Sequence, residues 1–231
     1  RQPCLQVALH VRRCREGPSR GLGLHRAGLG LGCPALPGPP GALHAHSGTQ
    51  GIMPSTCYDA KGLMLSAIAD NNPVLIIEHR FNFRNKGFVP EAPYRLPIGK
   101  GIIRKQGKDI TFVTISHMVT EAYKAAEELS KVGIDAEVID LRTLRPLDEE
   151  IILRSVAKTG RLLIADCGWK TGGITAEISA VVSEKGFEFI KAPIRRVACP
   201  DVPTPSGFTL EEGFYVGSND IISASREMLC K

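Results

Sequence analysis

The residues best suited to acid–base chemistry lie at the ends of apolar segments of this 231-residue chain. His79 follows the apolar run 74–78, and Ser116 and His117 stand where a strand pattern gives way to a helical one. A histidine can move a proton near neutral pH, although a strand-end histidine is more often simply solvated. The free amides of the first helical turn could hold an anion beside Ser116, although a plain serine cap is far commoner.

Glu177 is a carboxylate within an otherwise apolar helical pattern. It could be a buried acid, face solvent or pair with Arg195 or Arg196, and a structural ion pair is favoured over catalysis. Trp169 beside Gly168 is interpreted as a core or interface anchor.

Two arginines lie in residues 140–148, which have the sequence Asp-Leu-Arg-Thr-Leu-Arg-Pro-Leu-Asp. Arg142 and Arg145 could contact a ligand at the carboxyl edge of a sheet. The favoured interpretation is a salt bridge to Asp140 or Asp148. The segment predicts a tight joint in which a proline ends the strand and Asp148 caps the helix that follows.

The elements that must position these residues alternate along the chain. Short apolar or alternating runs predict strands over 74–78, 109–116, 136–141, 162–165 and 194–198. Apolar residues three and four apart predict helices over 59–69, 118–132, 149–159, 174–185 and 218–229. Residues 80–98 contain three prolines and little periodicity, and we expect an extended linker. Alternating strands and helices indicate an α/β fold with helices on both faces of a sheet.

The first 52 residues have a different composition from the rest. They contain six Arg, one acid, ten Gly and six Pro, and no aromatic residue. A segment of this kind can bury little apolar surface, so we expect residues 1–50 to lack regular sheet structure. A mitochondrial presequence, a Gly/Pro-rich interaction tail and out-of-frame translation of a GC-rich gene all fit, and the last is favoured.

Charge and cysteine content exclude several classes of protein. The six arginines and one acid of the first segment account for the whole net charge of +5, so the remainder offers no general basic face for nucleic acid. No apolar run approaches the ~20 residues that cross a bilayer. Seven cysteines without a C-x-x-C pair favour reduced thiols in a cytoplasmic compartment, with the mitochondrial matrix as the alternative.

Five separated segments resemble, in the same order, the beta subunit of the thiamine diphosphate-dependent 2-oxo acid dehydrogenases, and the joint at 140–148 resembles the C-terminal domain of the wider transketolase family. The segments are Pro-Ser-Thr-Cys-Tyr-Asp-Ala-Lys-Gly-Leu at 54–63, Asp-Asn-Asn-Pro-Val at 70–74 with Glu-His at 78–79, Pro-Ile-Gly-Lys at 97–100, Gly-Trp at 168–169 with Gly-Gly-Ile-Thr-Ala-Glu-Ile at 172–178, and Asp-Val-Pro-Thr-Pro at 201–205. The resemblance covers about residues 52–229.

The resemblance implies a fold and a division of the chain. We expect the end of a pyrimidine-binding α/β domain at 52–80, a linker at 81–94, and at 95–231 a three-layer transketolase-type C-terminal domain with a mixed, mostly parallel sheet. Residues 1–51 do not match and are expected to be disordered or artefactual.

The resemblance also implies an activity. In this family thiamine diphosphate, held with Mg²⁺, decarboxylates a 2-oxo acid and the acyl group passes to lipoamide. The implied partners are an alpha subunit, a second beta subunit and the dihydrolipoyl acyltransferase core, with no nucleic acid and no membrane. The C-terminal domain would serve assembly and docking.

The site residues of the family are mostly missing here. The Glu that activates the cofactor and the active-site His belong to an earlier part of the pyrimidine domain, and no role is transferred to His44 or His46. We therefore expect no catalytic or cofactor-binding residue in this chain, and no decarboxylation by the chain alone. Some family members hold a monovalent cation, such as potassium, on backbone carbonyls that correspond to Ala67, Ile68, Asp70 and Asn72.

A second interpretation is open. The chain could be a stand-alone transketolase-type C-terminal module that binds partners without thiamine chemistry. In either case the apolar segment 74–77 and the region of Trp169 need cover, so we expect dimers or a complex with an alpha subunit.

Overall fold

A computed structural model describes residues 48–205 and 213–229. Its larger part is a five-stranded sheet in the order β3-β5-β4-β7-β8. The strands are β3 (Ile102–Lys105), β4 (Ile110–Thr114), β5 (Ala136–Asp140), β7 (Leu162–Trp169) and β8 (Arg195–Cys199). All neighbours are parallel except β3, which runs antiparallel to β5.

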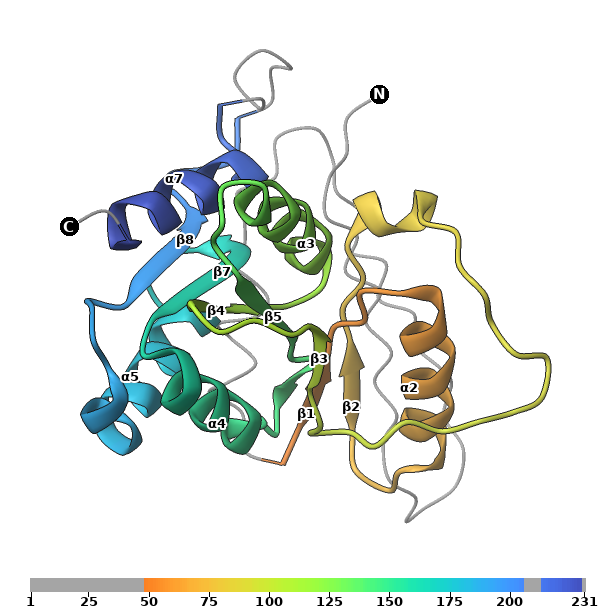
Figure 1. Ribbon diagram of the computed structural model, residues 1–231. Helices are drawn as coiled ribbons and strands as arrows, with labels where there is room; N and C mark the ends of the chain where they lie inside the picture. The colour runs from red at the N-terminus through yellow and green to blue at the C-terminus, as the bar shows by residue number, and fades with distance from the viewer. Residues whose placement is uncertain (1–47, 206–212, 230–231) are drawn as a thin grey trace.

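Helices cover both faces of this sheet (Figure 1). On one face, α3 (His117–Ser130) and α7 (Ser218–Leu229) pack on a core that includes Phe112 and Val138. On the other face, α4 (Glu149–Thr159) and α5 (Ile174–Lys185) pack on the next residues along the same strands, Val113 and Ile139. A short 3-10 helix, η2 (Phe187–Phe189), follows α5. Since successive strand residues point to opposite faces, the apolar runs supply both cores at once, and the predicted three-layer, mostly parallel α/β domain is confirmed.

A smaller sheet lies beside this domain, in the order β2-β1-β6. It contains β1 (Gln50–Ile52), β2 (Val74–Ile76) and β6 (Thr143–Arg145), with α2 (Cys57–Ala69) against it and the 3-10 helix η1 (Arg80–Arg84) following β2 (Figure 1). The strand β6 comes from the large domain and pairs antiparallel with β1. Main-chain hydrogen bonds between β1 and β6 therefore join the small-sheet region to a segment of the large domain.

The expectation that residues 1–50 lack sheet structure is wrong at its end. Gln50 is the first residue of β1, which pairs in parallel with β2 over Gln50–Ile52 and Val74–Ile76. Ile52 is fully buried. Composition did not predict this strand, because β1 has only three residues and lies at the end of the Gly- and Pro-rich segment. The interpretations of residues 1–47, including His44 and His46, lie outside the described residues.

The joint at 140–148 is longer and more ordered than expected. Instead of passing straight from strand to helix, it forms β6, and Arg142 in front of it has a positive φ of 60°. Asp148 makes no side-chain capping bond to α4. Its Oδ2 instead accepts a hydrogen bond of 3.0 Å from the Gly101 amide, so this carboxylate ties the entry of the large domain to the joint.

Two further differences are local. Residues 80–84 of the expected linker form η1, and the edge strand β3 was not predicted from the sequence. Within residues 48–205 and 213–229, no helix is long and apolar enough to cross a bilayer.

Candidate functional site

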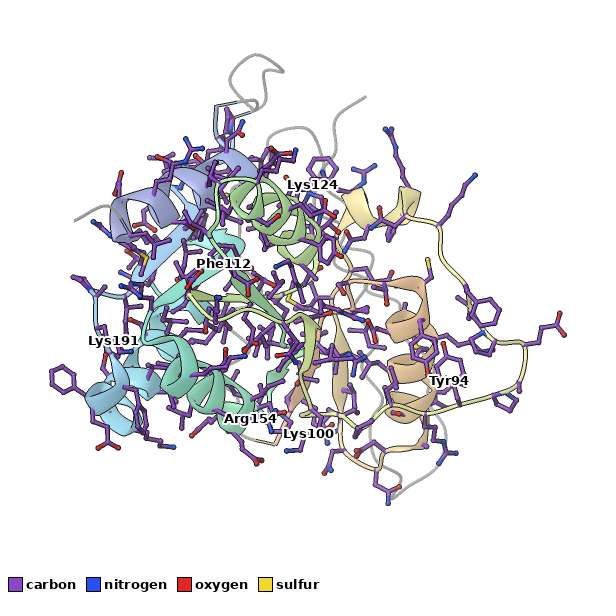
Figure 2. All side chains as sticks on the ribbon, in the orientation of Figure 1. Tyr94, Lys100, Phe112, Lys124, Arg154 and Lys191 are labelled. Atoms are coloured by element: carbon purple, nitrogen blue, oxygen red, sulfur yellow. The ribbon has the colours of Figure 1, made fainter. Side chains whose placement is uncertain are left out.

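Two polar clusters lie where the small-sheet region meets the large domain. The first, which we call the ion network, contains Asp59, Arg104, Asp140 and Arg142, with the hydroxyl of Ser55. The aspartate side chains are fully buried and those of Arg104 and Arg142 are 21% and 8% exposed. Figure 2 shows how densely side chains fill the space between the two sheets.

Each carboxylate of the ion network meets cationic nitrogen. The Nη2 of Arg104 bonds Asp59 and lies 2.8 Å from Asp140 Oδ2, while the Nη2 of Arg142 lies 2.7 Å from Asp59 Oδ1. Ser55 Oγ donates to Asp140 at 2.5 Å. Burial works against a charged guanidinium, but the Asp140 carboxylate raises the pKa of Arg104. Two negative and two positive groups thus pair away from water, as buried charges require, although Asp59 Oδ1 and Arg142 Nε have no hydrogen-bond partner among the described residues.

The ion network explains two of the sequence segments in physical terms. Thr56 caps α2 by accepting the Asp59 amide at 3.1 Å, and this places Asp59 in the first helical turn with its carboxylate toward the large domain. Asp140 ends β5, and its Oδ1 accepts the Arg142 amide at 3.0 Å. The predicted salt bridge of Arg142 to Asp140 or Asp148 is wrong: the guanidinium of Arg142, whose φ is positive, pairs with Asp59 of α2.

The second cluster, which we call the histidine cluster, contains His79, Asn82, Ser116, His117 and Glu121. The rings of His79 and His117 are stacked, with centroids 4.9 Å apart and planes at 13°. Asn82 Oδ1 lies 3.2 Å from His117 Nδ1, and Glu121 Oε1 lies 3.9 Å from His117 Nε2. The ring centroid of Phe81 lies 5.1 Å from the ring centroid of each histidine.

Burial keeps both rings neutral. His79 is 7% exposed, and burial followed by repulsion from His117 lowers its pKa from 6.5 to about 4. Burial also lowers the pKa of His117, although the carboxylate of Glu121 opposes this. The Phe81 amide donates to His79 Nδ1 at 3.3 Å, which leaves the ring proton on Nε2. The interpretation of His79 as a solvated strand-end residue is therefore wrong.

Ser116 carries backbone strain. Its φ of 52° and ψ of −125° are rare for a residue with a side chain, it is 2% exposed, and it makes no side-chain cap on α3. The serine-cap interpretation is wrong, and Ser116 Oγ instead accepts a hydrogen bond from Asn82 Nδ2 at 3.5 Å. Strain of this kind persists only where surrounding packing fixes it. Here β4, α3 and η1 converge on the residue.

The geometry of these clusters suits the joining of the two regions. In the ion network every charge already has a partner, and in the histidine cluster no nucleophile is hydrogen-bonded to a histidine base in the way covalent catalysis requires. Within the described residues, no group of three or more His, Cys, Asp or Glu side chains could hold a metal ion. The lining of the open hollow beside α2 does not fit thiamine diphosphate with its metal ion, since Arg95 is the only cationic side chain there and Asp70 the only carboxylate.

The remaining sequence candidates are scattered. Glu177 is exposed on α5 and makes no ion pair among the described residues, so the favoured pair with Arg195 or Arg196 is wrong. Arg195 pairs instead with Glu227 at 3.6 Å, and Arg196 Nη1 donates to the Lys170 carbonyl at 3.0 Å. Arg145 is half-buried in β6, and Trp169 is half-buried at the end of β7, opposite Cys199. These residues do not meet in one site.

Asp166 is a titratable group that sequence reasoning missed. It is 3% exposed near the end of β7. Burial raises its pKa to about 6, although hydrogen bonds from the amides of Gly168 and Cys167 lower the pKa in part. Its Oδ2 has no hydrogen-bond partner among the described residues. The available signal for Asp166 was a single acidic residue at the end of the apolar run Leu-Leu-Ile-Ala. Sequence reasoning also missed Arg104, which belongs to the ion network.

The turn proposed for a monovalent cation lies at the C-terminal end of α2. Ala67 and Ile68 belong to its last turn, and Asp70 and Asn72 follow. The Asp70 carboxylate is engaged by the Asn72 amide at 2.8 Å and by Gln50 Nε2 at 3.1 Å. An open hollow of about 360 Å³ lies beside this turn. Carbonyl oxygens at a helix end are suitable ligands for a hard cation.

Comparisons with known proteins agree with this architecture. The family model described as the C-terminal domain of transketolase matches residues 99–221. The 2-oxoisovalerate dehydrogenase subunit beta of Bacillus subtilis (strain 168) is 45% identical over 179 residues, which are 77% of this chain and 55% of the relative. From the same organism, the acetoin:2,6-dichlorophenolindophenol oxidoreductase subunit beta is 42% identical over 182 residues, 79% of this chain and 53% of the relative. The pyruvate dehydrogenase E1 component subunit beta is 40% identical over 191 residues, 82% of this chain and 58% of the relative.

The fold has a solved counterpart. A split gene transketolase, an inactive beta4 tetramer, superposes with a TM-score of 0.69 at 24% identity and covers 82% of this chain and 61% of that chain. The chain spans little more than half the length of the curated relatives above, 53–58%. The family model covers more than half of the chain itself, over β3 to the start of α7. The chain therefore belongs to the transketolase C-terminal domain family.

Proposed function

We propose that this chain is the C-terminal part of the beta subunit of a 2-oxo acid dehydrogenase and that it serves assembly and partner docking. The observation that carries the proposal is the ion network. Apart from Arg104 of β3, its residues come from segment 54–63, which resembles such subunits, and from segment 140–148, which resembles the wider transketolase family. The charges of the ion network pair with one another across the junction, which suits a structural role. The catalytic groups would then belong to other parts of the assembly.

In the full assembly thiamine diphosphate with Mg²⁺ would supply the decarboxylation chemistry. The pyrophosphate and the metal ion of this cofactor would be held by the alpha subunit, and its pyrimidine ring by the first half of the beta subunit. The other proposed partners are a second beta subunit and the dihydrolipoyl acyltransferase core. The tetrameric state of the split gene transketolase supports a beta–beta contact.

We also propose a potassium ion at the carbonyls of Ala67, Ile68, Asp70 and Asn72, where it would stiffen the turn before β2. Thermal unfolding in potassium chloride and in choline chloride at equal ionic strength tests this. A bound ion at 100 times its Kd stabilises by about 2.7 kcal/mol. Equal midpoints in the two salts would remove the proposal. A cytoplasmic location, with the mitochondrial matrix as the alternative, is proposed on cysteine content alone.

Reconstitution tests the main proposal. The chain is mixed with the first half of the 2-oxoisovalerate dehydrogenase subunit beta of B. subtilis and with the matching alpha subunit, and oxidation of the substrate is followed by the reduction of 2,6-dichlorophenolindophenol. Pyruvate, 2-oxoisovalerate and acetoin are each supplied. We expect turnover of one of them only when all three polypeptides are present. A complex of all three that turns over none of them would contradict the proposal.

The isolated chain gives a second check. We expect no measurable affinity for thiamine diphosphate and Mg²⁺ in titration calorimetry, because charge stabilisation needs donors arranged around the cofactor. Micromolar binding by the lone chain would show that the cofactor site has been misplaced. The alternative, a stand-alone binding module, is favoured if the chain fails to bind the alpha subunit yet associates stably with itself.

A further inference from the structure

Two cysteines lie at the carboxyl ends of neighbouring strands of the large sheet, outside both polar clusters. The strands β7 and β8 pair in parallel, with Ala165 opposite Val197 and Trp169 opposite Cys199. Between these two pairs the register is irregular, because β7 advances four residues where β8 advances two. Cys167 lies in the middle of this irregular stretch.

The irregular register brings the two cysteines within reach of each other. A strand rises about 3.3 Å per residue, and neighbouring strands lie about 4.8 Å apart. Cys167 is midway along a stretch that matches only two residues of β8, so its Cα lies within about one such rise of the level of Cys199. The two Cα atoms are then about 6 Å apart, inside the range of about 4.4–6.8 Å that a disulfide spans.

Both cysteine side chains lie on the same face of the sheet. Cys167 packs on the core under α3 and α7, together with Ala165 and Val197. Cys199 follows Val197 by two residues along β8, so its side chain points to that face as well. A hydrogen bond joins the Val216 amide to the sulfur of Cys199, and Val216 packs on the same core. The two sulfur atoms therefore share one environment under the entry to α7.

The two thiols differ in access but agree in protonation. Cys167 is half-buried, whereas Cys199 is 2% exposed, so a small reagent reaches Cys167 first. Burial raises the pKa of Cys167 well above its usual value, and Asp166 and Cys199 add to this rise. Burial also raises the pKa of Cys199 to about 11, although the hydrogen bond from the Val216 amide opposes the rise. Since the thiolate is the form that attacks a disulfide, exchange is slow at neutral pH and faster in alkali.

We propose that Cys167 is a site of exchange with low-molecular-weight disulfides and that Cys199 is its resolving thiol. The Cys167 thiolate attacks one sulfur of the reagent, forms a mixed disulfide and releases one thiolate of the reagent. The Cys199 thiolate then attacks the Cys167 sulfur and releases the second. The two cysteines lose two electrons and two protons, and the reagent disulfide becomes two thiols. The product ties the end of β7 to β8 under α7.

Peptide mapping of the full chain tests the proposal without any substitution. The folded chain is incubated with glutathione disulfide, free thiols are blocked with iodoacetamide, and trypsin then separates the two cysteines into peptides 162–170 and 197–226. We expect these two peptides to be recovered as a disulfide-linked pair that dithiothreitol separates. The pair should form about tenfold faster at pH 9 than at pH 8, because the thiolate fraction rises tenfold. The cross-link should also raise the midpoint of thermal unfolding by roughly 5–10 °C.

Three variants separate the roles of the thiols. Cys199→Ala removes the resolving thiol, so glutathione should stay attached to Cys167. Cys167→Ala should leave Cys199 unmodified, because the reagent does not reach it. Cys57→Ala is the matched control: the Cys57 thiol donates to the Asn85 carbonyl at 3.3 Å, and its removal should leave the cross-link unchanged.

Several results on the parent chain alone would overturn the proposal. Glutathione that persists on Cys167 would show that Cys199 does not resolve it. A link from either residue to another cysteine of the chain would do the same. A pair that forms in urea but not in the folded chain would show that the fold holds the two thiols apart, as would the absence of any reaction at Cys167.

Discussion

The ion network and the histidine cluster join the same two regions of the molecule by opposite means. In the network, Asp59 and Asp140 are held by the guanidinium groups of Arg104 and Arg142. In the cluster, His79 and His117 meet as neutral rings stacked 4.9 Å apart, with a depressed pKa on each.

The difference shows two ways of burying ionisable side chains: opposite charges can pair, or the groups can be kept neutral. The network keeps its charges because two arginines answer two aspartates. The cluster has one carboxylate, Glu121, which is also engaged by Lys124 at 2.7 Å and by the Ser218 amide at 3.1 Å. Too little negative charge remains for the histidines, so they stay unprotonated. The first junction should fail when a partner is removed, and the second when acid is added.

The largest expected effect is the loss of one carboxylate from the network. Asp59→Ala leaves two buried guanidinium groups short of a partner, and breaking a buried pair costs about 3–5 kcal/mol. Urea unfolding measures it. Glu128→Ala, which removes an exposed pair with Lys131 at 2.6 Å, is the matched control and should cost under about 1 kcal/mol. Similar midpoints for the two variants would mean that the network contributes no more than a surface pair.

Acid should reveal the histidine cluster. The pKa of His79 is lowered from 6.5 to about 4, so the unfolded chain binds the extra proton and stability is lost as the pH falls through this window. Between pH 7 and pH 5 the loss from this residue is about 2 kcal/mol. His79→Phe keeps a ring against His117 and cannot titrate, so its unfolding free energy should fall less over the same interval. Parallel pH profiles for parent and variant would refute the depressed pKa.

Asp166 should act in the opposite direction and more weakly. Its pKa is raised from 3.8 to about 6, so the folded chain holds the proton more tightly and this contribution is lost as the pH rises through 6. Between pH 5 and pH 7 the loss is about 1 kcal/mol. Asp166→Asn cannot ionise and should remove that slope, which chemical denaturation at several pH values would detect. A variant that keeps the slope would assign it to another group.

The smallest effect concerns the joint. Asp148→Ala should cost about 1 kcal/mol, because it deletes the hydrogen bond to the Gly101 amide. The residue lies outside both junctions, so the His79 pH profile should be unchanged in this background. Denaturant midpoints of the single and combined variants check both points. A cost equal to that of Asp59→Ala would mean that the joint and the network are one coupled unit.

Periodicity predicted the main elements of the large domain well. The helix over 149–159 and the helix over 174–185 were placed to the residue, since Gly160 and Gly186 stand directly after them and apolar residues recur at helical spacing. The strands β3 and β6 were missed. Each has four residues or fewer and carries basic side chains, so neither shows the alternation or apolar run that marks a buried strand.

The clusters were less predictable than the fold. The ion network joins Asp59 to residues 45 and 83 positions later, and local propensity contains no information on such contacts. His79 and Ser116 were singled out by residue type, but their stacking and strain depend on η1 folding back on α3. The family resemblance identified the segments that matter. The resemblance did not predict that Asp59 of segment 54–63 forms an ion pair with Arg142 of segment 140–148.

The strand β6 has a consequence for the order in which the protein is made. Ile52 finds its antiparallel partner in Thr143, about 90 residues later in the chain. A ribosome that adds about 5–20 residues per second needs roughly 5–18 seconds to supply that partner. During this time β1 and β2 can meet each other but not β6. The strands β1 and β2 are thus synthesised before the large domain, but the small sheet is complete only after β6 has been made. Until then, the edge of β1 that pairs with β6 lacks this partner.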